Sequence, residues 1–184
     1  MMSSVDELST EQLNFLVRLP MLLNSSLDIS RVIETTVHHL KSQLHAEAAT
    51  IFLLNEQQTE LTFWALDKGT AAGLKGKKMP ADKGMVGWVI KNQQSVICND
   101  VANDPRFFKT IDNESQFVTR SMICAPIIGP GSLVVGAIQV LNKAEGEFKQ
   151  NDLLFVEQLS HQAALAIRNA QLYNKAQLQA QKLE

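Results

Sequence analysis

Cysteine and long apolar runs are both scarce in this 184-residue chain. The two cysteines, Cys98 and Cys124, stand in the apolar stretches SVICND and SMICAPII, which favours buried free thiols over a disulfide or a metal site. No run of about 18 apolar residues occurs, so no membrane-spanning helix is expected. The opening residues MMSSVDELST lack the basic and apolar segments of a signal peptide. We therefore expect a cytoplasmic protein.

Neither sign of charge dominates the chain, because 17 lysines and arginines face 19 acidic residues, for a formal net charge of −2. Such a balance gives no general attraction to nucleic acid or to an acidic membrane surface, and neither is expected as a partner. Hydrophobic residues make up 45% and charged residues 20%, as in ordinary globular proteins. The length suits one domain with residues left over for extended helices.

Sequence patterns typical of enzymes and metal sites are also lacking. The four histidines, His38, His39, His45 and His161, have no neighbours at metal-ligand spacing, so surface or packed histidines are favoured. No serine stands in a nucleophile elbow, and no glycine loop has the spacing that cradles phosphate. The stretch GMVG follows a loop and opens a short helix, unlike a dinucleotide fingerprint. We expect no catalysis, no metal and no cofactor.

Apolar periodicity predicts long helices at both ends of the chain. Residues 1–27 form an N-terminal helix that Pro20 either kinks or ends near Leu19. From about Lys149 onward a helix of about 35 residues carries two apolar stripes, of which one covers the sheet or the first helix. The other is left for a partner helix, which favours a homodimer over a tail frayed beyond Tyr173. This second stripe contains Leu165, Leu172, Ala176 and Leu183.

Between the helices the sequence predicts strands joined by tight turns. The stretch AATIFLLNEQQTELTFWAL gives two strands around a polar turn, and QSVICND gives another. The stretches RSMICAPII and SLVVGAIQVLNK form a hairpin through Gly129-Pro130-Gly131. Hairpin-connected strands between terminal helices predict an α+β fold, with an antiparallel sheet covered by helices on one face. Polar residues near a long irregular loop at 101–117 then suggest that a concave sheet encloses a small molecule.

Several stretches resemble the GAF domain family in register, from about Leu22 to Tyr173. They are LNSSLDISRVIETTV, ADKGMVGWVIKNQQSVICNDVANDPRF, TRSMICAPI and VVGAIQVLNK. The resemblance is closest to the cyclic-nucleotide-binding GAF domains of phosphodiesterases and cyanobacterial adenylyl cyclases, which share the DPRF loop, an acidic stretch and TRS. It implies a central antiparallel sheet of five to six strands, with the terminal helices on one face and a loop and short-helix lid on the other. Residues 1–27 would be the N-terminal helix, 28–173 the GAF domain and 174–184 an extension of a signalling helix.

Those GAF domains carry a motif of Asn-Lys, a variable gap, Phe, three residues and Asp-Glu. This chain matches it at Asn142, Lys143, Phe148 and Asp152, whereas Leu153 stands where the family has Glu. In the family the Lys and Asp form a salt bridge near the closed pocket, which implies a structural latch. The helix dipole favours a carboxylate in the first turn of a helix, within reach of a strand-end lysine. The alternative is an exposed ion pair worth about 0–1 kcal/mol.

The resemblance also implies ligand contacts by position. Met85 and Val86 would offer backbone amides to a cyclic phosphate, as helix N-termini do for anions. Asp67 would read the edge of a base, and Gln139 would lie on the pocket floor. The plain alternatives are that Thr50 is a strand residue whose hydroxyl is already satisfied, that Asp67 and Asp112 are turn acids, and that Met85 and Val86 are ordinary core residues. The implied ligand-binding residues are Thr50, Asp67, Met85, Val86, Asp112, Ser115 and Gln139.

The resemblance therefore implies a regulatory module that binds a small molecule, with cyclic AMP or cyclic GMP as candidates. The signal would pass through the terminal helix of a homodimer to an output domain that this chain lacks. One alternative is a ligand-free dimerisation module. A free methionine sulfoxide reductase is another, although the GMVG turn lacks the cysteine of those enzymes. A bilin module would need a Cys-His pair that is missing here, and the histidines are badly placed for haem.

Overall fold

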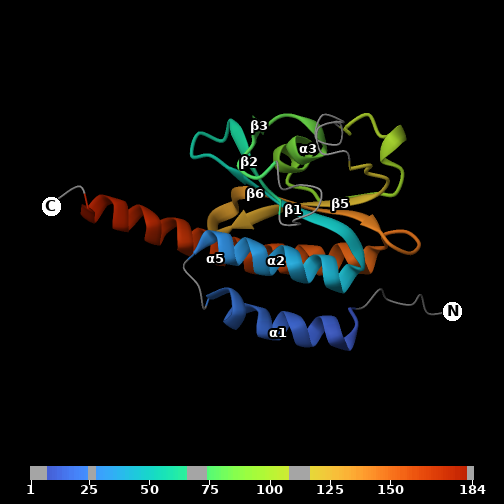
Figure 1. Ribbon diagram of the computed structural model, residues 1–184, viewed down its shortest axis with the longest axis horizontal. Coiled ribbons are helices and arrows are strands. Elements are labelled where there is room, and N and C mark those ends of the chain that lie inside the picture. Colours follow the sequence, from blue (N-terminus) through green and yellow to red (C-terminus); the bar gives the residue numbers. More distant parts are fainter. Residues whose placement is uncertain (1–7, 25–27, 66–73, 108–116, 182–184) are drawn as a thin grey trace.

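The computed structural model describes residues 8–24, 28–65, 74–107 and 117–181 (Figure 1). Four helices and six strands alternate along these segments. The helices are α1 (Thr10–Asn24), α2 (Ile29–Leu44), α3 (Gly84–Asn92) and α5 (Gln150–Gln181). The strands are β1 (Ala46–Leu54), β2 (Glu60–Ala65), β3 (Lys78–Pro80), β4 (Val96–Cys98), β5 (Met122–Gly129) and β6 (Leu133–Lys143). Two short 3-10 turns lie at Val101–Asn103 and Pro130–Ser132.

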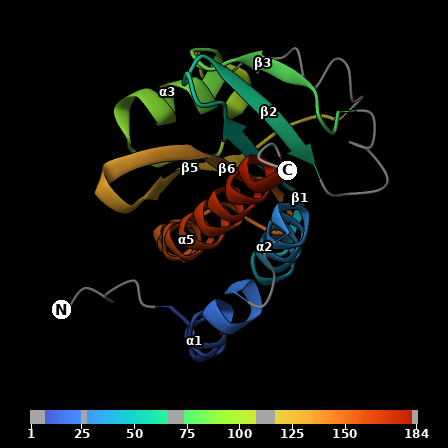
Figure 2. The ribbon, with the colours of Figure 1, turned by 90° about the vertical axis from the view of Figure 1, so that its left-hand side faces the viewer.

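The six strands form one sheet in the order β3-β2-β1-β6-β5-β4, with antiparallel pairing throughout. Helices α2 and α5 cover one face, and α3 lies over the other (Figure 1). Helix α1 packs on α2 and α5 as a further, outer layer (Figure 2). The predicted α+β class, the antiparallel six-stranded sheet and the placement of its helices are thus confirmed.

The alternation of side chains along β1 divides the core into two clusters. Ile51 and Leu53 are buried toward α2 and α5, whereas Phe52 is buried toward α3. Because successive side chains of a strand point to opposite faces, Thr50 lies on the α3 side with Phe52. The sequence of β1 therefore presents a hydroxyl to the face where a ligand was predicted.

Helix α2 is held by caps at both ends and by one apolar face. The carboxylate of Asp28 accepts a hydrogen bond from Ser30 N at 2.9 Å, satisfying an amide of the first turn. His45 ends the helix in the left-handed conformation, with φ of 48°. The inward face of α2 buries the apolar residues Val32, Ile33, Val37, Leu40 and Leu44.

Helix α1 continues through Pro20 to Asn24, so an end at Leu19 is wrong. Proline removes one backbone donor, but the helix is held by packing on either side of it, because Leu19 and Leu23 are fully buried. Phe15 stacks on His39 with ring centroids 4.3 Å apart and lies 6.1 Å from Phe155. Burial of these side chains outweighs the missing hydrogen bond.

Helix α5 has 32 residues and spans on the order of 50 Å, so it projects past the sheet (Figure 1). Its predicted inner stripe is buried through Ala170, whereas Leu165 and Leu172 of the second stripe are 46% and 49% exposed. Every residue from Leu172 to Gln181 is exposed. Among the described helices, none combines the length and apolarity needed to cross a membrane.

Candidate functional site

A row of three side chains crosses the middle of the sheet on the α3 side. Thr50 of β1 pairs with Gln139 of β6, which pairs in turn with Cys124 of β5. Directly opposed residues of neighbouring strands face the same side of a sheet. Cys124 belongs to the α3-side core, so Thr50 and Gln139 face α3 as well.

Thr50 and Gln139 are buried polar groups with unused hydrogen-bonding capacity. Thr50 is 4% exposed, and its Oγ1 makes no hydrogen bond with any residue that the structure describes. Gln139 is 9% exposed, and its Nε2 donates to the weak acceptor Met122 Sδ at 3.9 Å. An unsatisfied buried hydroxyl costs about 1–3 kcal/mol, so a ligand that bonded to it would recover that energy. The row can therefore orient a bound polar molecule.

The N-terminus of α3 lies against the same core. Met85 and Val86 are buried in the α3-side cluster, and the capping residue Lys83 provides no side-chain hydrogen bond. The first intrahelical bond runs from Gly87 N to Lys83 O at 3.0 Å, so the amides before it have no intrahelical acceptor. These amides can bind an anion with help from the helix dipole.

Asn142 ties the segment before β5 to the end of β6. Its side-chain amide donates to Glu47 Oε2 and to Val118 O, both at 2.8 Å. Its Oδ1 accepts from Arg120 N at 2.7 Å and from Ser121 N at 3.3 Å. The bond from Asn142 and the ion pair with Arg120 keep the pKa of Glu47 below its usual value, although desolvation opposes them.

Lys143, Phe148 and Asp152 meet where β6 is joined to α5. Lys143 Nζ forms an ion pair with Asp152 Oδ2, and the lysine side chain is only 19% exposed. The same oxygen accepts from Lys149 N at 2.9 Å, which caps the first turn of α5. Phe148 is buried, and its backbone exchanges two hydrogen bonds with the side chain of Asn99. These contacts join the ends of β4 and β6 to α5.

No sequence pattern identifies Glu47, Arg120 and Asn99 as partners of these residues. Glu47 and Asn142 lie 95 residues apart, and no local pattern reports such a contact. For Asn142 the residue type itself was a signal, because Asn142 adopts a left-handed φ of 56°. Asparagine is among the few residue types that tolerate this left-handed conformation. Asp67, Asp112 and Ser115 lie outside the described residues.

The DPRF stretch, residues 104–107, contacts α3 through Arg106 and Trp88. Arg106 donates to both carboxylate oxygens of Asp104, at 2.9 Å and 2.6 Å, and its guanidinium carbon lies 4.7 Å from the centre of the Trp88 ring. Hydrogen bonds from Arg106 lower the pKa of Asp104 from 3.8 to about 2. The chain is therefore anchored both before and after residues 108–116.

The Asp104–Arg106 pair predicts a loss of stability in acid. Because the folded pKa of Asp104 is depressed, its contribution is complete above about pH 4 and is lost as the pH falls toward 2. We expect Asp104→Asn to lower the free energy of unfolding by about 1–2 kcal/mol at pH 6, after allowance for solvent screening. Urea unfolding of both proteins from pH 6 to pH 2.5 should show the difference shrinking. A difference that stays constant with pH would contradict this assignment.

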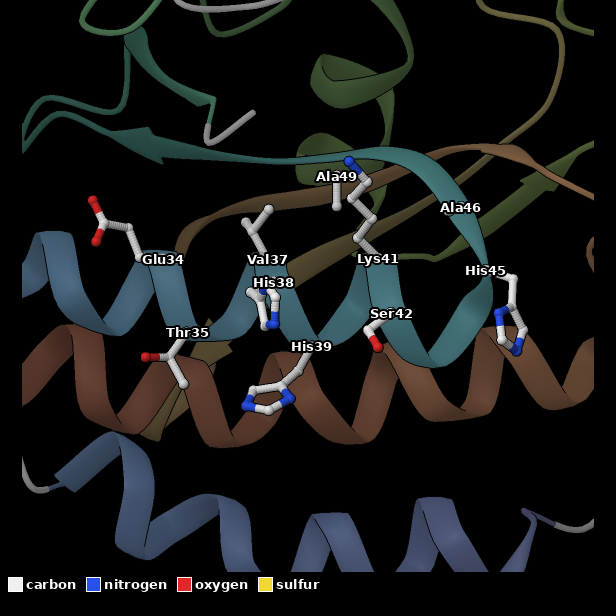
Figure 3. A pocket seen from close by; sticks show the side chains of 10 residues that line it. All are labelled: Glu34, Thr35, Val37, His38, His39, Lys41, Ser42, His45, Ala46 and Ala49. Carbon is white, nitrogen blue, oxygen red and sulfur yellow. The ribbon is translucent and has the colours of Figure 1, made fainter. Parts of the chain in front are cut away.

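A separate hollow of about 930 Å³ lies along α2 and the start of β1 (Figure 3). Three of the four histidines line it, and burial together with the neighbouring His38 lowers the pKa of His39. Within the described segments no three His, Cys, Asp or Glu side chains are grouped to hold a metal. None of the predicted ligand contacts lines this hollow, which is bounded by Glu34, Thr35, Val37, His38, His39, Lys41, Ser42, His45, Ala46 and Ala49.

Comparison with known families agrees with this architecture. A family model described as GAF domain matches residues 26–168. The chain belongs to the GAF domain family, and the predicted resemblance is confirmed. The match excludes all of α1 and the exposed end of α5.

Curated relatives include cyclic-nucleotide phosphodiesterases. The chain is 26% identical over 160 residues to the probable 3′,5′-cyclic phosphodiesterase pde-5 of Caenorhabditis elegans, covering 82% of this chain and 22% of that protein. It is 34% identical over 97 residues to the dual 3′,5′-cyclic-AMP and -GMP phosphodiesterase 11 of Drosophila melanogaster, covering 52% and 7%. The chain thus spans less than a quarter of the length of either relative.

Solved structures share the fold at low sequence identity. The GAF domain from an Acinetobacter phosphoenolpyruvate-protein phosphotransferase has a TM-score of 0.75 at 20% identity, covering 91% of this chain and 99% of that one. A free methionine-R-sulfoxide reductase from Neisseria meningitidis, in complex with its substrate, has a TM-score of 0.72 at 16% identity, covering 94% and 99%. Because one neighbour is an enzyme, the fold alone does not decide whether a chain is catalytic.

Proposed function

We propose that the chain is a regulatory GAF domain that binds a cyclic nucleotide between its sheet and α3. The observation that carries this proposal is the buried Thr50 hydroxyl, which has no hydrogen-bond partner among the described residues. Natural cores rarely keep such a group without a reason. Its neighbour Gln139 contacts only the sulfur atoms of Met122 and Cys124 among the hydrogen bonds of the described residues, and sulfur is a weak acceptor, so the two side chains offer a polar ligand new bonds.

The phosphate of the proposed ligand and its base and ribose would bind different parts of the site. Its phosphate would bind the amides of Met85 and Val86 at the start of α3, where the dipole favours an anion. Its base and ribose would bond to Thr50 and Gln139. Asp67, Asp112 and Ser115 complete the proposed site on the basis of the family resemblance. The phosphodiesterase relatives support the choice of a cyclic nucleotide over other small anions.

The effect of ligand binding would be transmitted to α5 through the residues that follow position 116. Asn142 holds residues 118–121 to β6, and Lys143 joins β6 to Asp152 of α5. We propose that these contacts act as a latch between the loop and α5 in a homodimer formed by the terminal helices. Such coupling requires the ligand to bind one arrangement of the helices more tightly than the other.

The proposal makes the chain a binding protein and not an enzyme, and its cysteines support this. Both Cys98 and Cys124 are buried in strands. Desolvation raises the pKa of both thiols, that of Cys124 to about 12. A reactive cysteine needs an accessible thiolate with a depressed pKa. These sites therefore disfavour sulfoxide reduction.

Thermal unfolding with excess cyclic AMP or cyclic GMP tests the proposal. A ligand at a hundred times its dissociation constant adds about 2.7 kcal/mol to the native state. For a domain of this size the midpoint should rise by roughly 5–10 °C. If neither nucleotide shifts the midpoint, the cyclic-nucleotide proposal is wrong and a ligand-free dimerisation module becomes the better description.

The Thr50→Val variant should separate binding from folding. Removing an unpaired buried hydroxyl should raise the stability of the free protein by about 1 kcal/mol, while the shift with nucleotide is lost. Thr36→Val is the matched control, because the Thr36 hydroxyl is equally buried but donates to Val32 O at 2.8 Å. This control should lose about 1 kcal/mol and keep the nucleotide shift. An undiminished nucleotide shift in Thr50→Val would place the ligand elsewhere.

A further inference from the structure

A further hollow, of about 680 Å³, lies at the end of the sheet past which α5 projects (Figure 1). Its walls are the turn between β1 and β2, the start of β6, and the part of α5 from Arg168 to Leu178. Among the described residues, none of the proposed nucleotide contacts lines it. Its volume lies within the range of about 300–1,000 Å³ that is common for small-molecule sites. We therefore examined which ligand its side chains fit.

Apolar side chains form much of the wall. Leu133, Leu172 and Leu178 are 37%, 49% and 60% exposed, and all three line the hollow. Ile29 of α2 and Leu54 of β1 extend the same wall. A ligand with an apolar body would remove this surface from water, which favours binding. A purely polar ligand would leave it wet.

The charges that line the hollow do not balance. Two bases, Arg168 and Lys175, face one acid, Glu56. Lys175 Nζ forms an ion pair with Glu56 Oε1 at 3.0 Å, so this acid already has a partner. Arg168 is partly buried and makes no hydrogen bond or ion pair with any residue that the structure describes. The hollow therefore carries one positive charge in excess.

The sequence explains why Arg168 has no acidic partner. No Asp or Glu occurs between Glu157 and Glu184, so no acid stands three or four residues away along α5. In the neighbouring strand, Glu60 is paired with Lys78 at 2.7 Å. A guanidinium is a planar fork that binds a carboxylate through two parallel hydrogen bonds. One excess charge suits a monocarboxylate better than a phosphate ester, which carries nearly two negative charges.

One wall of the hollow is fixed, and another is supported only by the ligand site itself. Asn55 Oδ1 accepts from the amides of Thr59 and Glu60, at 2.9 Å and 3.1 Å, which holds the turn between β1 and β2. The ion pair of Lys175 joins this turn to α5. Every residue from Leu172 to Gln181 is exposed, so the outer end of α5 lacks other packing. A ligand that contacts the turn and α5 together would hold this end of the helix.

We propose that the hollow binds a small monocarboxylate with an apolar tail. The carboxylate pairs with Arg168, and the tail covers Leu133 and Leu172. This site goes beyond the proposed function, because it is separate from the proposed nucleotide site and does not depend on it. The hollow is open to solvent and the ligand is small, so we expect a dissociation constant on the order of 0.1–1 mM.

Titration of the full chain with octanoate, followed by the backbone amide signals in NMR spectra, tests the charge. Acetate lacks the tail and octan-1-ol lacks the carboxylate, so each should bind at least tenfold more weakly than octanoate. Arg168→Gln should weaken octanoate binding by roughly tenfold or more. Arg18→Gln is the matched control, because Arg18 is an exposed arginine of α1 that does not line the hollow, and it should leave binding unchanged. No binding of octanoate, or equal binding by Arg168→Gln, would overturn the proposal.

The apolar contact is tested by Leu172→Asn. We expect this change to weaken octanoate binding by roughly fivefold, because part of the wall that covers the tail becomes polar. Leu165→Asn is the control, since Leu165 is similarly exposed on α5, at 46%, but lies outside the hollow. Equal effects of the two substitutions would show that the tail does not bind at Leu172.

Hydrogen exchange tests the effect on α5. If opening of the helix end destroys the site, octanoate at ten times its dissociation constant should slow exchange of the amides at 172–178 by about tenfold. Binding without slower exchange would refute the link to α5. Arg168→Gln should change the thermal midpoint by less than about 2 °C, because no described partner is lost. A larger fall would show that Arg168 is structural and would overturn its assignment to a ligand.

The result can be read separately from nucleotide binding. Thermal shifts with cyclic nucleotides should persist in Arg168→Gln, because Arg168 lies outside the proposed nucleotide site. Octanoate binding without any nucleotide shift would refute the proposed function alone. A nucleotide shift without octanoate binding would refute the carboxylate site alone.

Discussion

The Asn142→Ala variant should lose about 3 kcal/mol of folding free energy and unfold roughly 10 °C below the wild type. Its side chain makes four hydrogen bonds, which reach Glu47, Val118, Arg120 and Ser121. Each net bond contributes about 0.5–1.5 kcal/mol, and alanine at φ of 56° adds about 1 kcal/mol of strain. Urea unfolding measures the total.

Asn142→Gly separates these two causes, because glycine adopts a positive φ without strain. We expect this control to be about 1 kcal/mol more stable than the alanine variant, while both lose the side-chain bonds. Hydrogen exchange at the amides of Arg120 and Ser121 should accelerate in both variants, since these amides donate to Asn142 Oδ1. Unchanged exchange would show that Asn142 does not hold this segment.

Gly136→Ala should destabilise the sheet by a similar amount, about 3 kcal/mol. A Cβ built on Gly136 would lie 1.9 Å from Phe52 O and 3.1 Å from Leu53 Cα. Both contacts are with the backbone of β1, which is paired on both sides and cannot move aside as a flexible side chain would. The pairing of β1 with β6 must therefore open locally, as chemical denaturation would report.

Gly129→Ala provides the comparison at the last residue of β5, next to the turn. The nearest atom to its added Cβ would be Val135 Cγ2 at 3.5 Å, an ordinary contact, and its φ of −85° suits any residue. We expect a change within about 0.5 kcal/mol. Equal losses at the two glycines would mean that the close approach of β6 to Phe52 is not the cause.

The fold was predictable because its signals are local. Apolar stretches bounded by turn residues marked the strands, and Gly129-Pro130-Gly131 marked the turn between β5 and β6. The motif from Asn142 to Asp152 was found through its resemblance to the GAF domain family. Its ligand-linked role stays a prediction.

Other features escaped because their causes are distant or ambiguous in sequence. The bond of Asn142 to Glu47 spans most of the domain. In α1 the neighbouring Leu22 and Leu23 differ in burial, since Leu22 is 46% exposed and Leu23 is buried. Only packing against the other helices decides between neighbouring leucines.

The two anchors at Asp104–Arg106 and at Asn142 have an evolutionary consequence. They fasten the chain to the scaffold on either side of residues 108–116. The entropic cost of closing a chain segment between fixed points grows slowly with its length, by about 0.6 kcal/mol for each doubling. Insertions, deletions and wholesale exchange between these anchors should therefore be tolerated. A lineage could acquire a new ligand by rewriting nine residues while keeping the sheet and its helices unchanged.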